Sequence, residues 1–129
     1  MNIEPKVELK KYQISHIETQ FENMNLGQNV ISVETDAKIQ KKLDKSSLDQ
    51  IVELSLVFKN DQSGLLVFAI TTKAKVVIPD ASDETQINEY NKEAVRIAYN
   101  ITRKAISEIS SISNVNFLEI PEFDDVFKK

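Results

Sequence analysis

The longest segment with a helical pattern is residues 83–114, which read DETQINEYNKEAVRIAYNITRKAISEISSISN. Apolar side chains recur here at steps of three and four, so at 3.6 residues per turn they form one stripe. Asp83 is placed to cap the first turn, Gln86 to return the bond, and Asn114 is a suitable stop. The segment therefore predicts an amphipathic helix over residues 83–113. The stripe comprises Ile87, Tyr90, Ala94, Ile97, Ala98, Ile101, Ala105, Ile109 and Ile112.

The helix carries a second apolar row about 100° around its axis from the first, so its apolar surface is wider than one sheet needs. At about 1.5 Å per residue the helix is also about 45 Å long, whereas a four-stranded sheet is only ~19 Å across. We therefore expect part of the helix to contact another subunit, unless the helix breaks near Tyr90 to Lys92. The alternative is that the second row belongs to the edge of the chain's own core. The predicted interface residues are Val95, Tyr99, Thr102 and Ile106.

Four segments before the helix alternate between apolar and polar residues, as strands do. They cover about residues 7–22, 30–40, 51–59 and 65–78, and the alternation of the first slips in phase, which indicates bulges. The second has one polar face, whereas the third and fourth are apolar on both faces and should be the central strands. Four strands followed by a helix predict an α+β domain, with an antiparallel sheet covered on one side by the long helix.

The 129 residues form one predicted domain, since 41% hydrophobic and 28% charged content is ordinary for a globular chain. Residues 115–129 are rich in apolar side chains, and we expect this tail to fold back on the sheet or on a neighbour. The chain has no cysteine, no apolar run long enough to span a membrane and a charged start where a signal peptide is apolar. We therefore expect a cytoplasmic protein without membrane insertion.

Few residues in the chain could carry catalysis. His16 is the only histidine and lies on a predicted strand, and no serine sits in the strand-turn-helix elbow of a serine nucleophile. The net charge of −4, from 20 acidic and 16 scattered basic residues, argues against nucleic acid as a partner. We predict no catalytic residues, no metal site and no cofactor, and interpret the surplus apolar surface as serving subunit and partner contact.

Several short motifs resemble those of the protein-export chaperone SecB. The helix and tail carry Tyr99-x-x-x-Arg103-x-x-Ile106-Ser107 and then Pro121-x-Phe123-Asp124-x-Val126-Phe127. In SecB, similarly, a long helix bearing an arginine leads to a Pro-x-x-Phe-Asp-x-Leu-Phe-like segment. The first strand carries Glu18-x-x-Phe21-Glu22 with Asn25 just beyond, which looks like SecB's acidic-x-x-Phe-Glu stretch and its following asparagine. The resemblance spans most of the chain.

The resemblance implies a four-stranded antiparallel sheet with one long helix, assembled as a tetramer that is a dimer of dimers. It also implies an ATP-independent holdase that binds unfolded or non-native polypeptides in protein export and passes them to SecA. Several apolar sites would hold one client at once. The alternative for each candidate client residue is burial in a subunit interface. These client-binding candidates are Met24, Leu26, Ile51, Val57, Leu65 and Val67.

Docking of SecA has weaker support in the sequence. Glu18 and Glu22 match acidic positions used in docking that motor, but the fourth strand has Ala69 where an acidic residue is expected. The chain also has no cysteine for the family's zinc-binding tail. SecB-like relatives include dedicated chaperones of toxin–antitoxin systems. The second hypothesis is therefore an oligomeric adaptor or dedicated chaperone for a single partner, and a small-molecule enzyme is a third, which lacks catalytic groups.

Overall fold

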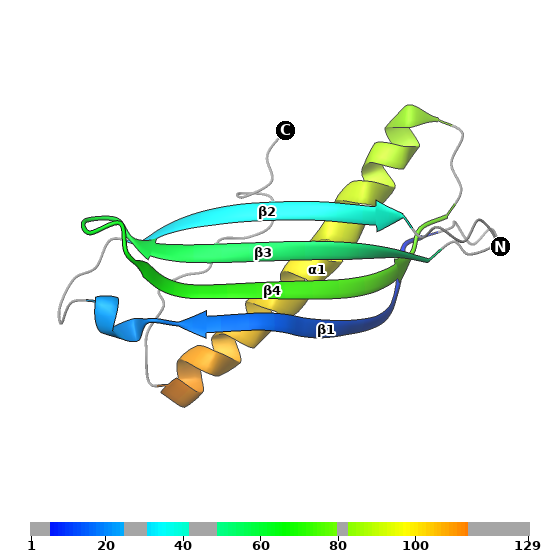
Figure 1. Cartoon of the computed structure of the whole chain (residues 1–129). Helices are drawn as coiled ribbons and strands as arrows, with labels where there is room; N and C mark the ends of the chain where they lie inside the picture. The colour runs from blue at the N-terminus through cyan, green and yellow to red at the C-terminus, as the bar shows by residue number, and fades with distance from the viewer. Residues whose placement is uncertain (1–5, 25–30, 42–48, 80–82, 114–129) are drawn as a thin grey trace.

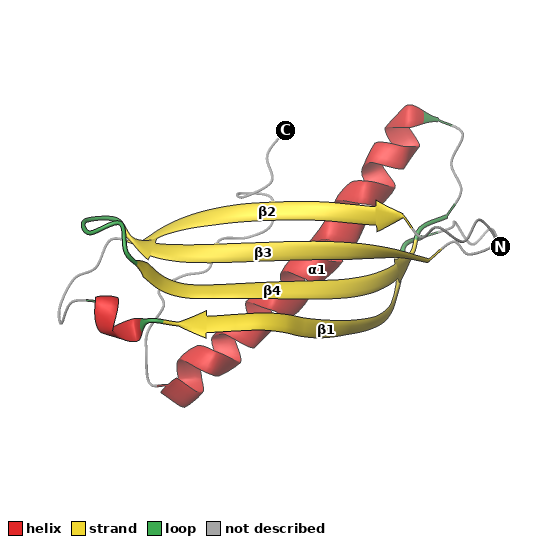
Figure 2. Ribbon diagram, in the orientation of Figure 1, coloured by secondary structure: helices red, strands yellow, loops and turns green. Residues whose placement is uncertain are grey.

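The structure is a computed structural model, and it describes residues 6–24, 31–41, 49–79 and 83–113. Four strands form one antiparallel sheet in the order β1-β4-β3-β2, and one long helix lies across one face of it (Figures 1 and 2). The elements are β1 (Glu8–Thr19), the 3-10 turn η1 (Phe21–Asn23), β2 (Ile31–Lys41), β3 (Asp49–Asn60), β4 (Leu66–Val77) and α1 (Glu84–Ser113).

The predicted fold class, a four-stranded antiparallel sheet followed by one long helix, is confirmed. The central strands are β3 and β4, as their two apolar faces indicated. The first strand ends at Thr19, before its predicted end, because the chain then enters η1, where the N–H of Asn23 donates to the carbonyl of Gln20 at 3.0 Å. The predicted apolar tail, residues 115–129, lies outside the described residues.

Two register shifts interrupt the pairing of β1 with β4, one between Leu9 and Lys11 and one between Ile14 and His16. Each shift adds one residue to β1 that has no partner in the ladder, which returns the following apolar side chains to the face that they would otherwise leave. The phase slip in the sequence has this cause. As a result, the apolar residues of β1 project to one side of the sheet, the side on which α1 lies.

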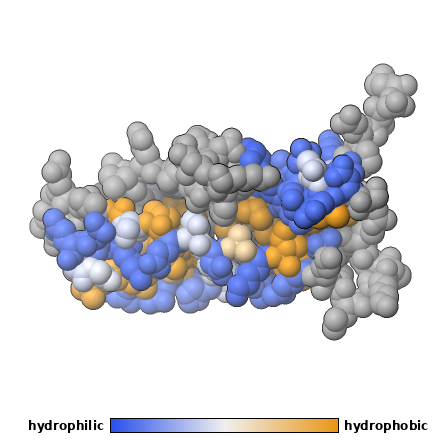
Figure 3. Space-filling model, turned by 90° about the horizontal axis from the view of Figure 1, so that it is seen from above, coloured by the Kyte–Doolittle hydropathy of each residue, from blue (hydrophilic) through white to orange (hydrophobic). Residues whose placement is uncertain are grey.

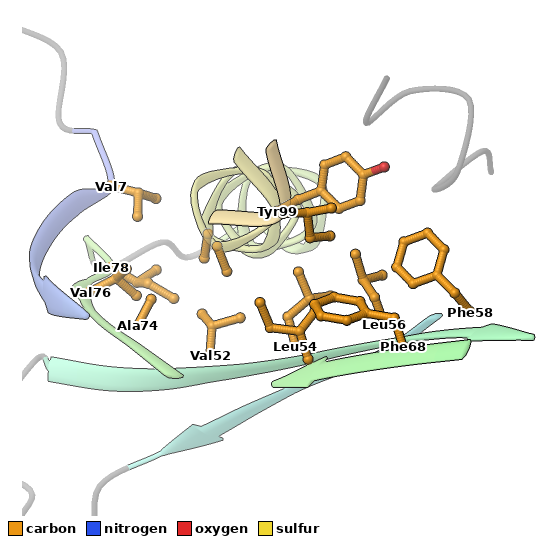
Figure 4. Packing of buried hydrophobic residues seen from close by; sticks show 14 of the residues in the cluster. Val7, Val52, Leu54, Leu56, Phe58, Phe68, Ala74, Val76, Ile78 and Tyr99 are labelled. Carbon is orange, nitrogen blue, oxygen red and sulfur yellow. The ribbon is translucent and has the colours of Figure 1, made fainter. Parts of the chain in front are cut away.

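The core lies between α1 and the two central strands (Figure 4). Alternate residues of β3 and β4 face the helix, which meets them with the small, fully buried side chains of Ala94 and Ala98. At the hairpin end, Phe21 of η1 stacks on Phe68 with their ring centroids 6.2 Å apart. The strand residues of this core include Val52, Leu54, Leu56, Phe58, Phe68, Ile70, Ala74 and Val76.

The helix faces the sheet with part of the predicted stripe, Ala94 and Ala98, and also with most of the second apolar row. We expected Tyr99, Thr102 and Ile106 at a subunit interface, but at most 1% of each is exposed, because they lie in the protomer's own core. The Thr102 hydroxyl donates to the carbonyl of Ala98 at 2.8 Å and is hydrogen-bonded to the Thr72 hydroxyl on β4 at 2.7 Å. For these three residues, assignment to an intersubunit contact is therefore wrong and the alternative, a place in the core, is correct.

Helix α1 crosses the strands diagonally, and both of its ends extend past the sheet (Figure 1). Its 30 residues correspond to about 45 Å, more than twice the width of four strands. Asp83 caps the helix as predicted, since its carboxylate accepts the Thr85 N–H at 2.8 Å. The side-chain amide of Gln86 donates to the Tyr90 hydroxyl at 3.1 Å.

Candidate functional site

Cross-strand pairing assigns each strand residue to one of the two sheet faces, because directly opposed residues of an antiparallel pair project to the same side. The inner face is the one that α1 covers, and the outer face is turned toward the viewer in Figure 1. Tyr12 lies opposite Ala74, and Ile17 lies opposite Ile70. Both β4 residues are buried core residues, so Tyr12 and Ile17 belong to the inner face.

The inner face of β1 carries an exposed apolar strip, formed by Leu9, Tyr12, Ile14 and Ile17 and named here the β1 strip. Leu9 is 40% exposed, Tyr12 57% and Ile17 48%, whereas Ile14 is half-buried and packs against the core. These side chains are exposed because α1 packs mainly on β3 and β4 and covers only part of the edge strand. Exposed apolar side chains that gather on one element mark an interaction surface.

The other edge strand, β2, has a smaller apolar surface on the same inner face. Val33 is 37% exposed, and the other apolar residues of β2 on this face are half-buried and pack against the core. Seen from the β2 side, hydrophobic side chains are visible between polar regions of the surface (Figure 3). The inner face therefore has uncovered apolar surface at both of its edges. The inner-face residues of β2 packed against the core are Ile31, Ala37 and Ile39.

The outer face of the sheet is mostly polar along its edge strands. Two predicted client residues, Ile51 and Val57, lie on this face and are half-buried. Ile51 is opposite Lys75 on β4, and Val57 is opposite Glu34 on β2, so charged side chains flank both. The largest exposed apolar side chains of the strands are therefore on the inner face at β1, a surface that we did not predict from the sequence.

Val67, another predicted client residue, has no exposed surface. It lies at an irregularity in the pairing of β3 with β4, where Phe58 is opposite Phe68 but the next residue, Lys59, is opposite Leu66. Its carbonyl accepts the Gln20 N–H at 2.8 Å, which joins the segment after β1 to β4. A fully buried side chain cannot contact a client in this structure, and the prediction for Val67 is corrected accordingly.

The other predicted client residues lie near the hairpin that joins β3 and β4. Leu65 is 53% exposed at the end of that hairpin, and Met24 is half-buried and packs against the core. Asn60 and Asn23 connect the hairpin to η1, because the Asn60 side chain donates to the carbonyl of Asn23 at 2.9 Å. Leu26 lies outside the described residues.

The two predicted docking residues lie at one end of β1. Glu18 is exposed on the outer face opposite Ala69, with its carboxylate 3.7 Å from Nε2 of His16. Glu22 is exposed on η1. Ala69 is thus the residue beside Glu18 on β4 at the position where the resemblance leads one to expect an acidic side chain. Docking of a partner through Glu18 and Glu22 stays a prediction.

The helix retains a partly exposed apolar row on a different side from Tyr99. It consists of Ile87, Tyr90, Ile97 and Ile101 and is named here the outer helix row. Ile87 is 41% exposed, and the other three are half-buried. Val95, the fourth residue predicted at a subunit interface, is half-buried and packs against the core.

The described ranges also bear on metal and membrane sites. Among residues 6–24, 31–41, 49–79 and 83–113, no group of three or more His, Cys, Asp or Glu residues could hold a metal ion. In the same part of the chain, no helix combines the length and the hydropathy needed to cross a bilayer. His16 is exposed on the outer face.

Comparison with known proteins gives one informative result. No family model and no curated protein matches the chain. Among solved structures, the chain is similar to the Mycobacterium tuberculosis SecB-like chaperone in complex with a ChAD peptide from the HigA1 antitoxin. The TM-score is 0.65 at 8% sequence identity, and the match covers 90% of this chain and 86% of that chain. The chain therefore has the fold of a SecB-like chaperone, as the sequence motifs led us to expect.

Proposed function

We propose that the chain is an ATP-independent holdase that binds unfolded or non-native polypeptides without a catalytic step. The observation that carries this proposal is the β1 strip, in which three large apolar side chains are 40% to 57% exposed along one edge strand. The SecB-like fold supports a function of the chaperone class. Apolar surface of this kind is costly to leave in water unless a partner covers it.

An edge strand offers two kinds of contact to an extended polypeptide. Its outward backbone groups can pair with another strand, and its alternate side chains form apolar positions about 6.8 Å apart. Non-native chains expose the apolar residues and unpaired strands that a folded protein buries. The β1 strip would therefore select non-native segments, and binding energy alone would hold them without nucleotide hydrolysis.

We further propose that the holdase is a homo-oligomer, a tetramer built as a dimer of dimers. Several β1 strips in one particle would bind separate segments of one client, and each later contact would then be intramolecular and stronger. The proposed helix contact between copies is the outer helix row, in place of the buried residues Tyr99, Thr102 and Ile106. The overhang of α1 past the sheet makes its ends accessible to a second copy (Figure 1).

A dedicated chaperone or adaptor for a single partner is the second candidate. It is favoured by the solved SecB-like neighbour, which is in complex with a peptide from an antitoxin. Such a protein would bind one polypeptide through its apolar surface and would not act on unrelated clients. Coupling to SecA is not part of the proposal, because Ala69 occupies the position on β4 where the resemblance leads one to expect an acidic residue.

The test of the proposal measures aggregation of several unrelated, chemically unfolded proteins by light scattering without ATP. The wild-type chain, its mass fixed by static light scattering, is expected to suppress aggregation of all of them. The variant Tyr12→Ser/Ile17→Ser removes two exposed apolar side chains of the β1 strip. We expect it to fold, since neither residue is buried, and to lose most of the suppression.

Two further variants show which surface of the protein suppresses aggregation. Ile112→Ser removes an apolar side chain that is 86% exposed at the far end of α1 and is expected to leave suppression unchanged. Leu65→Ser tests the hairpin position that the sequence indicated. Loss of suppression in Leu65→Ser, with full suppression by Tyr12→Ser/Ile17→Ser, would assign client binding to the hairpin. A stable oligomer that suppresses no aggregation but binds one partner would instead support the dedicated chaperone.

A further inference from the structure

The outer face of the sheet is covered by none of the described helices and strands, since α1 lies behind the sheet in Figure 1. The centre of this face is apolar or small, because Ile51, Val57 and Ala69 are half-buried there. Between them the hydroxyl groups of Ser55 and Thr71 are hydrogen-bonded to each other at 3.0 Å. Low side chains at the centre of a sheet allow a second sheet to approach to the usual packing distance of about 10 Å.

The strand register arranges the outer face symmetrically about one line that runs across all four strands. The line passes through four directly opposed residues that project to the inner face, namely Ile14, Thr72, Leu54 and Ala37. If a second copy is turned by half a turn about this line, each strand lies over its own copy and runs in the opposite direction. Outer-face residues at equal distances on either side of the line then meet each other.

On the edge strands, this arrangement brings opposite charges together. Lys11 on β1 meets Glu18 of the second copy, and Lys38 on β2 meets Asp36 of the second copy. All four side chains are exposed. Lys38 and Asp36 are already 3.9 Å apart within one protomer, so two copies would form a group of four charges of alternating sign. Complementary charge favours the association of two surfaces.

On the central strands, charged side chains meet small or hydroxyl-bearing ones, and the two apolar side chains of β3 meet each other. The meeting pairs are Ile51 with Val57 and Glu53 with Ser55 on β3, and Lys75 with Ala69 and Lys73 with Thr71 on β4. Lys75 has an interaction within its own protomer, and this arrangement requires no new partner for it. Across these central pairs no two like charges are opposed.

Other two-fold arrangements of the same face do bring like charges together. An axis parallel to the strands, between β3 and β4, would place Glu18 over Glu34 of the second copy. An axis across the strands but moved by one residue, to Glu53, would place Glu53 and Lys38 each over its own copy. Opposed like charges disfavour an arrangement. The register therefore favours the line through Leu54 and Thr72.

We propose that a second copy of this chain packs on the outer face about this two-fold axis. Four strands and four opposed positions cover about 19 Å by 27 Å, so the two copies would bury about 1,000 Å², near the lower limit for a specific interface. Packed sheets are rotated by about 30°, which moves the edge pairs by about 4 Å, within reach of a lysine side chain. The association is therefore weak, reversible and weakened by salt.

The first experiment measures the mass of the full chain by static light scattering as a function of protein concentration. At low salt the mass is expected to rise with concentration, and the rise is expected to fall at least about threefold when salt is raised. This association is distinct from the proposed contact through the outer helix row, which would set the mass of the smallest particle. A mass independent of concentration at low salt would overturn the proposal and leave the face to a partner of different sequence.

Two variants test which residues meet. Ile51→Asp places a carboxylate over Val57 of the second copy, and Val57→Lys places an ammonium group over Ile51, in both cases at two symmetry-related contacts. Both variants are expected to fold, because Ile51 is opposite Lys75 and Val57 is opposite Glu34, so each new charge faces an opposite one. Each variant alone is expected to lower the association constant at least about tenfold, since a charge would be desolvated against an apolar side chain.

An equimolar mixture of these two variants gives the sharper test. In a mixed pair the new carboxylate meets the new ammonium group, and the other contact is Ile51 with Val57 as in the wild type. Association is therefore expected to recover to within about threefold of the wild type. Both positions lie on the central strand β3, so pairing of two sheets through their edges does not bring them together. No recovery in the mixture, with both variants folded by circular dichroism, would contradict the proposal.

Ile112→Asp is the matched control for Ile51→Asp. It makes the same exchange at the end of α1, where the side chain is 86% exposed, and is expected to change the association constant less than about twofold. Equal losses in Ile112→Asp and Ile51→Asp would mean that the added charge, not the outer face, governs association, and would reject the proposal. Mass is measured without any client, so this result is independent of the test for holdase activity.

Discussion

Thr72 and Thr102 form a buried polar pair that helps to fix which side of α1 faces the sheet. The two hydroxyl groups are 2.7 Å apart between β4 and α1, and both residues are fully buried. The side chain of threonine suits either the edge or the centre of an apolar face, so the sequence could not place Thr102 in the core. In the structure, the hydroxyl group of Thr72 on β4 is the partner that allows Thr102 to lie in the core.

Replacing Thr102 by valine is expected to lower the free energy of unfolding by about 1–3 kcal/mol. The substitution preserves the shape of the side chain but leaves the Thr72 hydroxyl buried with a partner removed. The double variant Thr72→Val/Thr102→Val removes both hydroxyl groups and is expected to recover most of that loss. Urea denaturation followed by circular dichroism measures both, and wild-type stability in the single variant would contradict the role of this pair.

Asp83 provides a second prediction for a single side chain. Its carboxylate accepts the N–H of Thr85 at 2.8 Å, so Asp83→Ala is expected to cost about 1 kcal/mol of stability. Asp83→Asn keeps a capping oxygen and is expected to cost much less. Thermal or urea unfolding of the two variants measures this difference in stability. Equal stability of the alanine and asparagine variants would exclude a capping contribution.

At the scale of elements, β1 and α1 account for most of the difference between expectation and structure. The phase slip correctly indicated bulges in β1, and the two bulges bring Leu9, Tyr12 and Ile17 to a common face. That signal was present in the sequence. Their exposure was not, because it depends on how α1 crosses the sheet, and a helix with a wide apolar arc can pack in several rotations.

The outer helix row leads to a prediction about assembly. Ile87 is 41% exposed near the start of α1, so Ile87→Asp is expected to leave the fold intact and to reduce the mass of the oligomer in static light scattering. Desolvating a carboxylate at an apolar contact is unfavourable, which is the physical reason. Asn100→Asp introduces the same group at an exposed helix position outside this row and should leave the mass unchanged. An unaltered mass in Ile87→Asp would exclude this position from the interface.

For the whole molecule, the fold could be predicted well and the candidate site only in part. Strand alternation and helical periodicity are local patterns, and the apolar second faces of β3 and β4 correctly marked them as central. The site depends instead on which apolar surface remains uncovered after packing. Val67 was predicted to contact clients and is buried, whereas Tyr12 was not predicted and is 57% exposed.

The most direct test of the central claim is site-specific photo-crosslinking to an unfolded client. A benzoylphenylalanine residue would replace Tyr12 in the β1 strip or, in a second variant, Val57 on the outer face, and adducts would be identified by mass spectrometry after illumination without ATP. We predict that position 12 crosslinks to several unrelated clients and that position 57 does not. Crosslinking at position 57 with none at position 12 would contradict the assignment of client binding to the β1 strip.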